Sequence, residues 1–457
     1  MIYYTKILSR FFLDWVGVIV IVIFALYAAV FTPYNNSPHI RSDGVGYHIW
    51  THAIKSGDFT FKKYQSILSS VIAIAGKYED GKKYQIKYPP GVALLRLPFM
   101  IWVTDPNKTD GFSKAEHTTS QICALISLFL MISVMIYILT KMEINKYIIQ
   151  LSLIVIIFGT GLFHYSTYDN SFSHIYTAFL VTLLSFSILN QPVKGKNFWI
   201  FFSSFFLILV RNTNFFILLF FWLLWIVRKG LKKNLVLILY SGSGLAFASM
   251  IQIGINYFYS GNMTLSSYGG ESFLWNRPMF FSVLFSYERG LFNYYPIYAI
   301  VISAGLISSR SRTLTIIYTS MILFFAGLYG YWHSWFLGGG FGHRGFVDIA
   351  PIGIIILAVA LNQLKEKQID FFLLFSCVFL FLTLQLMWGY WQGTIPFDGT
   401  SATLYWAHIF GQKQTPTLIV SIFIMVLFYL RFRFVNQKTS MQSKKGVRIM
   451  SASPIVR

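Results

Sequence analysis

The chain has 457 residues, of which 55% are hydrophobic, 19% aromatic and only 12% charged, and its mean hydropathy is +0.59. A soluble protein of this length could not keep so much apolar surface away from water, so the composition predicts a polytopic membrane protein. The formal net charge of +21 is spread in short clusters between apolar runs, which excludes a basic nucleic-acid-binding domain. Cys123 and Cys377 lie in apolar runs, which predicts small buried residues and no disulfide.

Apolar runs close to the ~20 residues that cross a bilayer predict an all-α protein with about 11–12 transmembrane helices. Residues 198–227 form a longer run broken by Arg211-Asn-Thr-Asn214. We interpret this run as a tight hairpin of two short helices, because that choice keeps the basic clusters on one side. The alternative is one helix and a reversed second half. The other spans are predicted at 15–32, 120–140, 147–165, 173–190, 234–257, 291–308, 313–331, 345–361, 369–388 and 414–430.

The distribution of lysine and arginine predicts the orientation. If the residues before the first span are cytoplasmic, so are more than half of the 37 basic residues, whereas most of the 16 acids lie outside. The first span is long enough to remain as an anchor, and we expect no signal-peptide cleavage. We predict a membrane domain over 1–430 and a basic cytoplasmic tail over 431–457, whose Lys444, Lys445 and Arg448 would face anionic lipid.

The one large hydrophilic segment is the first extracytoplasmic loop, over 33–118. Tyr47, Trp50 and Ile54 recur there at helical spacing, which predicts a helix that lies in the membrane interface. The cytoplasmic loops are too short to bind ATP or a nucleotide sugar, and no phosphate-binding glycine motif is present. Substrates should therefore come from the membrane or from the outer compartment.

The stretch from Arg41 to His48 contains the first candidate catalytic residue. Asp43 is a carboxylate predicted at the membrane surface, where ionisable groups are costly and often functional. Gly44 and Gly46 are predicted to let the chain turn sharply beside it. The alternative is a glycine-rich turn with a solvated aspartate.

Further polar residues gather on the predicted outer side. A second group, His164, Asp169 and His174, lies between two spans, and Lys87 precedes a rigid Tyr-Pro-Pro-Gly91 turn. Three arginines on one face would suit a phosphate, because guanidinium groups offer forked donors. This fourth group consists of Arg211, Arg289 and the pair His343-Arg344.

Each candidate also has a structural interpretation. Asp169 and His174 can be a helix cap with a hydrogen-bonded histidine. Arg211 can anchor a hairpin tip at the headgroups, and Lys87 can be an ordinary interfacial lysine. His48 and His52 have the i, i+4 spacing of metal ligands, but no partner motif lies near them in the sequence.

Several motifs together resemble the GT-C superfamily of integral membrane glycosyltransferases, over about residues 10–430. The bacterial branch related to protein O-mannosyltransferases and aminoarabinose transferases is the most similar. The motifs are Ser42-Asp43-Gly44 with Gly46-Tyr47, the Tyr88-Pro-Pro-Gly91 turn, Tyr165-Ser with Asp169 and Ser173-His174, Arg211-Asn-Thr-Asn214, Arg289-Gly-Leu-Phe-Asn-Tyr-Tyr-Pro296, and Gly342-His-Arg-Gly-Phe346 with Pro351.

The resemblance implies an enzyme of the bacterial cytoplasmic membrane with its active site outside. Asp43 would be the general base for an acceptor hydroxyl, with inversion at the anomeric carbon of a polyprenyl-phosphate-linked sugar. For this role its pKa would be raised by the apolar interface, or it would only orient the hydroxyl. Arg344, Arg289, and Arg211 or Lys87, would hold the lipid phosphate.

Asp169 and His174 match a position that binds acceptor or metal in the family, so a divalent metal held by Asp43, Asp169 and His174 is a further hypothesis. The acceptor, a lipid, a glycan or a protein, stays open. His48 stands where many relatives have an aromatic residue, and we expect no large soluble C-terminal domain of the kind that some relatives use to bind the acceptor.

Two other functions compete with a lipid-linked sugar transferase. A transporter or lipid flippase would also have many spans, but its charges usually lie near the bilayer midplane on broken helices. A polysaccharide polymerase or ligase would be expected to carry its large loop late in the chain.

Overall fold

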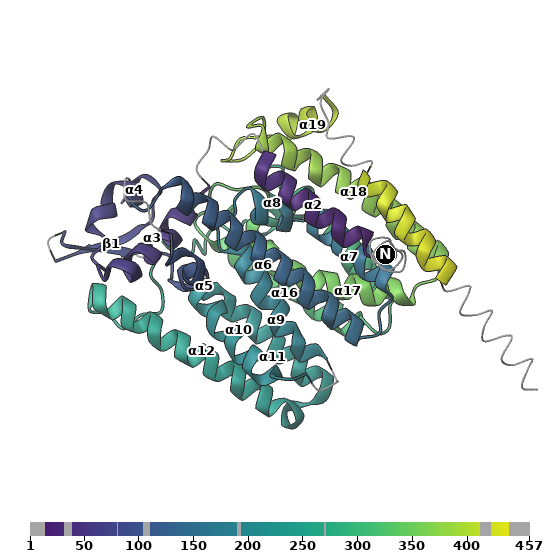
Figure 1. The fold of residues 1–457 in the computed structure, drawn as a ribbon, viewed down its shortest axis with the longest axis horizontal. Helices are drawn as coiled ribbons and strands as arrows, with labels where there is room; N and C mark the ends of the chain where they lie inside the picture. The colour runs from purple at the N-terminus through teal and green to yellow at the C-terminus, as the bar shows by residue number, and fades with distance from the viewer. Residues whose placement is uncertain are drawn as a thin grey trace, which may run out of the picture.

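The structure, a computed structural model, describes residues 14–31, 39–79, 81–103, 110–189, 193–268, 271–411 and 422–437. These residues form a helical bundle with one small sheet (Figure 1). The elements are α2 (Val16–Phe31), α3 (Asp43–Ser56), η2 (Lys62–Tyr64), α4 (Gln65–Ser70), β1 (Ile74–Tyr78), β2 (Lys83–Ile86), α5 (Gly91–Met100), α6 (Lys114–Lys141), α7 (Lys146–Gly159), α8 (Leu162–Thr167), α9 (His174–Leu184), η3 (Ser185–Ile188), α10 (Lys196–Val210), η4 (Asn212–Asn214), α11 (Phe215–Lys229), α12 (Leu231–Ser260), α13 (Phe280–Phe285), α14 (Leu291–Tyr294), α15 (Ile297–Ile307), α16 (Arg312–Tyr331), η5 (Arg344–Ile349), α17 (Ala350–Gln363), α18 (Glu366–Trp391), α19 (Ala402–Gly411) and a last helix over 422–437.

Six helices in the described part of the chain are long and apolar enough to cross a membrane. They are α6, α11 with η4, α12, α16, α17 with η5, and α18. The predicted membrane fold is therefore confirmed, although several predicted spans are shorter helices. α7 ends at Gly159 and α8 begins at Leu162, and Pro296 separates α14 from α15. A proline lacks the N–H that a continuous helix needs at such a position.

The run over 198–227 is a hairpin of two helices, as predicted. Lys196 at the start of α10 donates a hydrogen bond to the Leu189 carbonyl, and Arg228 near the end of α11 donates one to the Ile188 carbonyl. The two helices therefore leave and return at the same end of the bundle. The break is the η4 turn, which begins directly after Arg211.

One end of the bundle gathers the segments that were predicted to share the cytoplasmic side. Lys146 pairs with Asp14 at 2.7 Å, and Asn145 hydrogen-bonds to both Asn362 and Gln437. The last helix runs to residue 437, so it continues past the boundary predicted at 430. The basic residues of the predicted tail, Lys444, Lys445 and Arg448, lie outside the described residues.

The first loop forms a folded cap at the opposite end, where α3, α4 and β1 lie together at the left of Figure 1. The helix predicted from Tyr47, Trp50 and Ile54 is α3. The loop also contains an antiparallel pair of strands, β1 and β2, which the sequence did not indicate. Gln85 of β2 hydrogen-bonds to Asn256 of α12 at 2.8 Å, which attaches the sheet to the bundle.

Candidate active site

Asp43 is the first residue of α3 and forms an ion pair with Arg344, the first residue of η5. Their side chains are 2.8 Å apart, and about a fifth of the Asp43 side chain is exposed. The Tyr88 hydroxyl also hydrogen-bonds to Asp43. The structure therefore brings together three of the predicted motifs, which are far apart in the sequence.

The two glycines beside Asp43 do not make a turn, and the prediction of a sharp turn there is wrong. Both lie inside α3, and the residue with the left-handed backbone angle is Ser42, with φ of 48°. A Cβ on Gly44 would lie 2.0 Å from Ser171 Oγ, and one on Gly46 would lie 2.3 Å from Tyr88 Cδ2. The glycines therefore allow α3 to pack against these two side chains, and the space beside them is filled.

The electrostatics of Asp43 favour its ionised form. Burial raises the pKa of Asp43, but the Arg344 guanidinium and the Tyr88 hydroxyl lower it by more, so the net pKa lies below the ordinary value of 3.8. A raised pKa, one of the two alternatives drawn from the sequence, is therefore wrong for the protein without substrate. A general-base role for Asp43 would therefore require a bound substrate to weaken its contact with Arg344, whereas an orienting role would not.

A second ion network lies beside this pair. Arg211 donates to Asp348 at 2.9 Å, and His174 hydrogen-bonds to the other oxygen of Asp348 at 2.8 Å. Asp348 lies on η5, four positions after Arg344, and its side chain is only 3% exposed. Sequence reasoning did not single out Asp348. An acid within an apolar predicted span was the signal that could have identified it.

Asp169 belongs to a third network. The Trp391 indole donates to His164 Nδ1 at 2.8 Å, so His164 Nε2 carries the hydrogen and donates it to Asp169 at 2.8 Å. Arg41 donates to the same carboxylate through two nitrogens, at 3.0 and 2.8 Å, and lies over the Tyr168 ring. Burial raises the pKa of Asp169, but Arg41 and His164 lower it well below its usual value.

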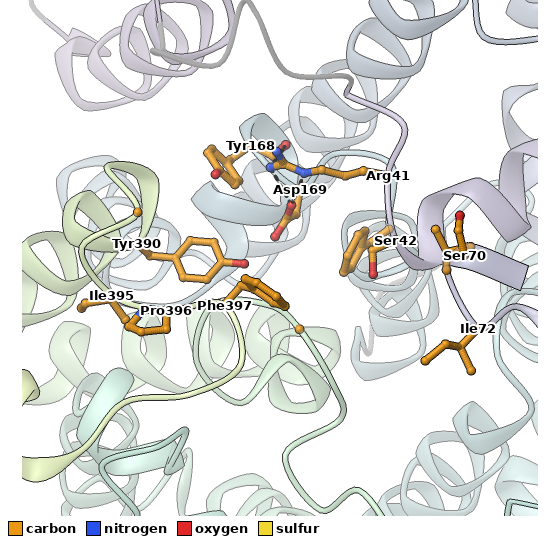
Figure 2. A pocket seen from close by; sticks show the side chains of 14 residues that line it. Arg41, Ser42, Ser70, Ile72, Tyr168, Asp169, Tyr390, Ile395, Pro396 and Phe397 are labelled. Atoms are coloured by element: carbon orange, nitrogen blue, oxygen red, sulfur yellow. Dashed lines mark hydrogen bonds and ion pairs between the residues drawn. The ribbon is translucent and has the colours of Figure 1, made fainter. Parts of the chain in front are cut away.

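This third network borders a cavity of about 620 Å³. Figure 2 shows Arg41, Tyr168 and Asp169 on one side of the cavity, and Tyr390 with Phe397 on another. Ser42, the residue directly before Asp43, also lines this cavity. The cavity therefore reaches the start of α3, where Asp43 pairs with Arg344.

Asp43, Asp169 and His174 are not among the side chains with metal-ligand spacing in the described part of the chain, so their geometry gives no support to the metal hypothesis. Each has its own partner: Arg344 for Asp43, Arg41 and His164 for Asp169, and Asp348 for His174. Among the described residues, the group of three side chains with metal-ligand spacing is a different one, His48, His52 and Glu116.

Two further predicted ligand residues serve the loop between α16 and η5. Arg289 is buried and donates to the carbonyls of Gly340 and Phe397. His343 is completely buried and hydrogen-bonds to the Trp335 carbonyl at 3.0 Å. Both side chains hold this loop together in the structure, and the substrate-binding role predicted for them stays a prediction.

Lys87 forms an ion pair with Glu271 at 2.8 Å. The positive charge of Lys87 also helps to lower the pKa of Asp43.

Arg96 is a buried cation that sequence reasoning missed, although it interrupts an apolar run. It donates to the Tyr176 hydroxyl and to the Asn170 and Ser171 carbonyls. Arg96 thereby holds the segment against which Gly44 packs.

No protein-family model and no curated protein matches the sequence. The crystal structure of ArnT from Cupriavidus metallidurans bound to undecaprenyl phosphate has a similar fold, with a TM-score of 0.48 and 12% sequence identity over 91% of this chain and 74% of that chain. ArnT in the apo state gives a TM-score of 0.47 and 11% identity, over 93% and 76% of the two chains. At this distance the case for an activity depends on the side chains of this protein.

Proposed function

We propose that this protein is a glycosyltransferase that moves a sugar from a polyprenyl-phosphate-linked donor to an acceptor hydroxyl. The observation that carries the proposal is the partly exposed Asp43–Arg344 pair, whose aspartate directly follows Ser42, a residue that lines the 620 Å³ cavity. A carboxylate and a guanidinium are the two groups that such a transfer needs, one for the hydroxyl proton and one for the phosphate.

Binding of the donor is expected to change the surroundings of both Arg344 and Asp43. A donor phosphate gives Arg344 a second anion, so the guanidinium is shared and its hold on Asp43 weakens. Burial then dominates the environment of Asp43 and raises its pKa toward that of a useful base. Arg211 stands nearby as a second cation, and His174 positions it through Asp348.

The transfer step follows from this arrangement. The acceptor oxygen forms a bond to the anomeric carbon and gives its proton to Asp43. The bond from the anomeric carbon to the phosphate oxygen breaks, and its electron pair leaves with the lipid phosphate, which Arg344 stabilises. Attack opposite the leaving group inverts the anomeric configuration.

Two cavities near α3 suit the two substrates of this reaction. The polar cavity with Arg41 and Asp169 offers hydrogen bonds to an acceptor hydroxyl. A second cavity of about 440 Å³ is lined almost wholly by apolar side chains of α3, α5 and α12, among them Trp50, Leu94 and Phe258. This apolar groove suits the isoprenoid tail of the donor.

The positive charges favour a site that faces the outer side of a bacterial cytoplasmic membrane. The segments rich in lysine and arginine meet at the end of the bundle opposite Asp43. A donor carried on a membrane lipid is consistent with a site at the surface of the bundle, because the tail can stay in the bilayer while the headgroup reaches Asp43.

Asp43→Asn is the variant that tests the proposal. Transfer from a radiolabelled polyprenyl-phosphate sugar by the purified protein is expected to fall by about 100-fold or more, because general base catalysis is lost. Asp58→Asn is the matched control, since Asp58 lies in the same loop but is exposed, and among the described residues its side chain hydrogen-bonds only to Thr60. Undiminished transfer by Asp43→Asn would exclude the mechanism, and uptake of the labelled lipid without any product would identify a transporter.

A further inference from the structure

A second cluster of ligand-type side chains lies between α3 and the start of α6, away from the Asp43 site. His48 and His52 are one turn apart on α3, and Glu116 lies in the first turn of α6. One possible ligand atom from each residue lies within 4.8 Å of the other two. Two histidines at i, i+4 on one helix, joined by a glutamate from another, are a donor set that proteins use for zinc.

His48 is prepared as a ligand by the hydrogen bond that it already makes. Its Nε2 lies 2.7 Å from the Gly111 carbonyl oxygen. A carbonyl can only accept, so Nε2 carries the hydrogen and the free lone pair is on Nδ1. This Nδ1 is buried and has no partner among the described residues. Histidines that bind metals commonly donate their other N–H to a carbonyl in this way.

Glu116 is held so that one oxygen is free to face the histidines. Its Oε2 accepts hydrogen bonds from the Ser113 backbone N–H and hydroxyl, each at 2.9 Å. Its Oε1 lies 2.9 Å from His52 Nε2. An ion pair between these two residues would account for their contact, but it would leave the buried Nδ1 of His48 without a partner, whereas a cation among the three would satisfy all of them.

Gly111 is shaped for a close approach to this cluster. It has a φ of 88°, and a Cβ at this position would lie 2.6 Å from His52 Nε2. Only glycine therefore lets the carbonyl that orients His48 come so near to His52. Gly111, the helix cap of α6 and the two histidines therefore hold one another in a fixed geometry.

We propose that His48, His52 and Glu116 bind one divalent transition-metal ion of the zinc type, with water completing the coordination. The ion ties α3 to α6 and so fixes the helix that begins with Asp43, without contacting Asp43 itself. It acts as a positioning element of the first loop. This inference is independent of the proposed transfer reaction, since the ligands and their geometry do not involve a substrate.

Zinc titration of the full-length protein in detergent, after removal of metals by a chelator, tests the site. We expect one zinc ion per chain and a higher melting temperature with zinc. Glu116→Gln and His52→Asn should each weaken zinc binding by more than the roughly 10–100-fold that loss of an outer-shell partner costs. Glutamine can still accept the bonds from Ser113, so the helix cap survives in the first variant.

His333→Asn is the matched control, because His333 also contacts a glutamate, Glu271, at the surface. It should bind zinc like the unmodified protein. Elution as a single species and an unchanged helical circular dichroism spectrum show that each variant is folded. The proposal is overturned if the folded protein takes up no zinc in proportion to chain, or if Glu116→Gln and His52→Asn bind zinc as tightly as the control.

Discussion

Asp43 and Asp348 lie at the same end of the bundle, and each is paired with an arginine, but they differ in what else surrounds them. Among the described residues Asp43 forms an ion pair with Arg344 only, and its side chain is about a fifth exposed. Asp348 has Arg211 and His174 on its two oxygens and is 3% exposed. The first carboxylate has capacity left for a ligand, whereas the second is fully used by the protein. We therefore expect the Asp43 pair to serve substrate binding and the Asp348 pair to serve positioning.

Replacing Asp348, the more buried of the two carboxylates, should have the largest effect on stability. Asp348→Asn leaves Arg211 and His174 without their anion, and we expect a loss of about 3–5 kcal/mol in the free energy of unfolding. The control is Asp370→Asn, since Asp370 pairs with Arg431 at the opposite end in a more exposed setting, where loss of a pair costs about 1 kcal/mol or less. Unfolding in denaturant distinguishes the two, and equal losses would mean that Asp348 is not a positioning residue.

Changes to the more exposed pair, Asp43 and Arg344, should lower activity more than stability. Arg344→Lys keeps a positive charge but loses the forked donors, and we expect kcat/KM for the lipid-phosphate donor to fall by about 10–100-fold. Arg277→Lys serves as the control, because Arg277 is an exposed arginine in the connection between α12 and α13. Steady-state kinetics with purified protein provide the measurement. An Arg344→Lys enzyme with normal kcat/KM would remove the guanidinium from phosphate binding.

The pH dependence of activity separates the two influences on the pKa of Asp43, which are burial and the Arg344 guanidinium. Its folded pKa is lowered below 3.8, so the carboxylate contributes stability above that pH and loses it as the pH falls through the lowered pKa. The acid limb of kcat/KM, which reports the free enzyme, should therefore lie below pH 3.8. In Arg344→Gln the raising effect of burial is no longer opposed by the guanidinium, and the limb should move to higher pH. A limb that stays in place would show that Arg344 does not set the pKa of Asp43.

Some of these features could be predicted from the sequence because their signals are local. The polar break at Arg211-Asn-Thr-Asn214 between two apolar runs was sufficient to predict the α10–α11 hairpin. Asp43 was singled out as a candidate because an acid beside a membrane surface is costly, and its catalytic role stays a prediction. The helix α3 followed from the spacing of Tyr47, Trp50 and Ile54.

Other features depend on contacts between distant segments and left no local signal. Glu116 meets His48 and His52 only because α6 packs beside α3, and in the sequence it is indistinguishable from an ordinary helix-capping glutamate. The roles of Gly44 and Gly46 depend on Ser171 and Tyr88, which no spacing rule places against them. The burial of Arg289 and His343 likewise depends on the folded loop around them, which no local sequence pattern indicates.

The smallest expected effect concerns the apolar groove on the Asp43 side, which the Asp348 network does not border. Gly254 lines this groove, and a Cβ there would meet nothing within 4 Å. Gly254→Leu should therefore fold normally, fill part of the groove and raise the KM for a long-chain donor a few-fold, since each buried methylene contributes about 0.8 kcal/mol. Gly242→Leu on the same helix is the control, because Gly242 also has free space but lies outside the groove. A donor with a short tail should not distinguish the two variants, and if it does, the groove does not hold the lipid tail.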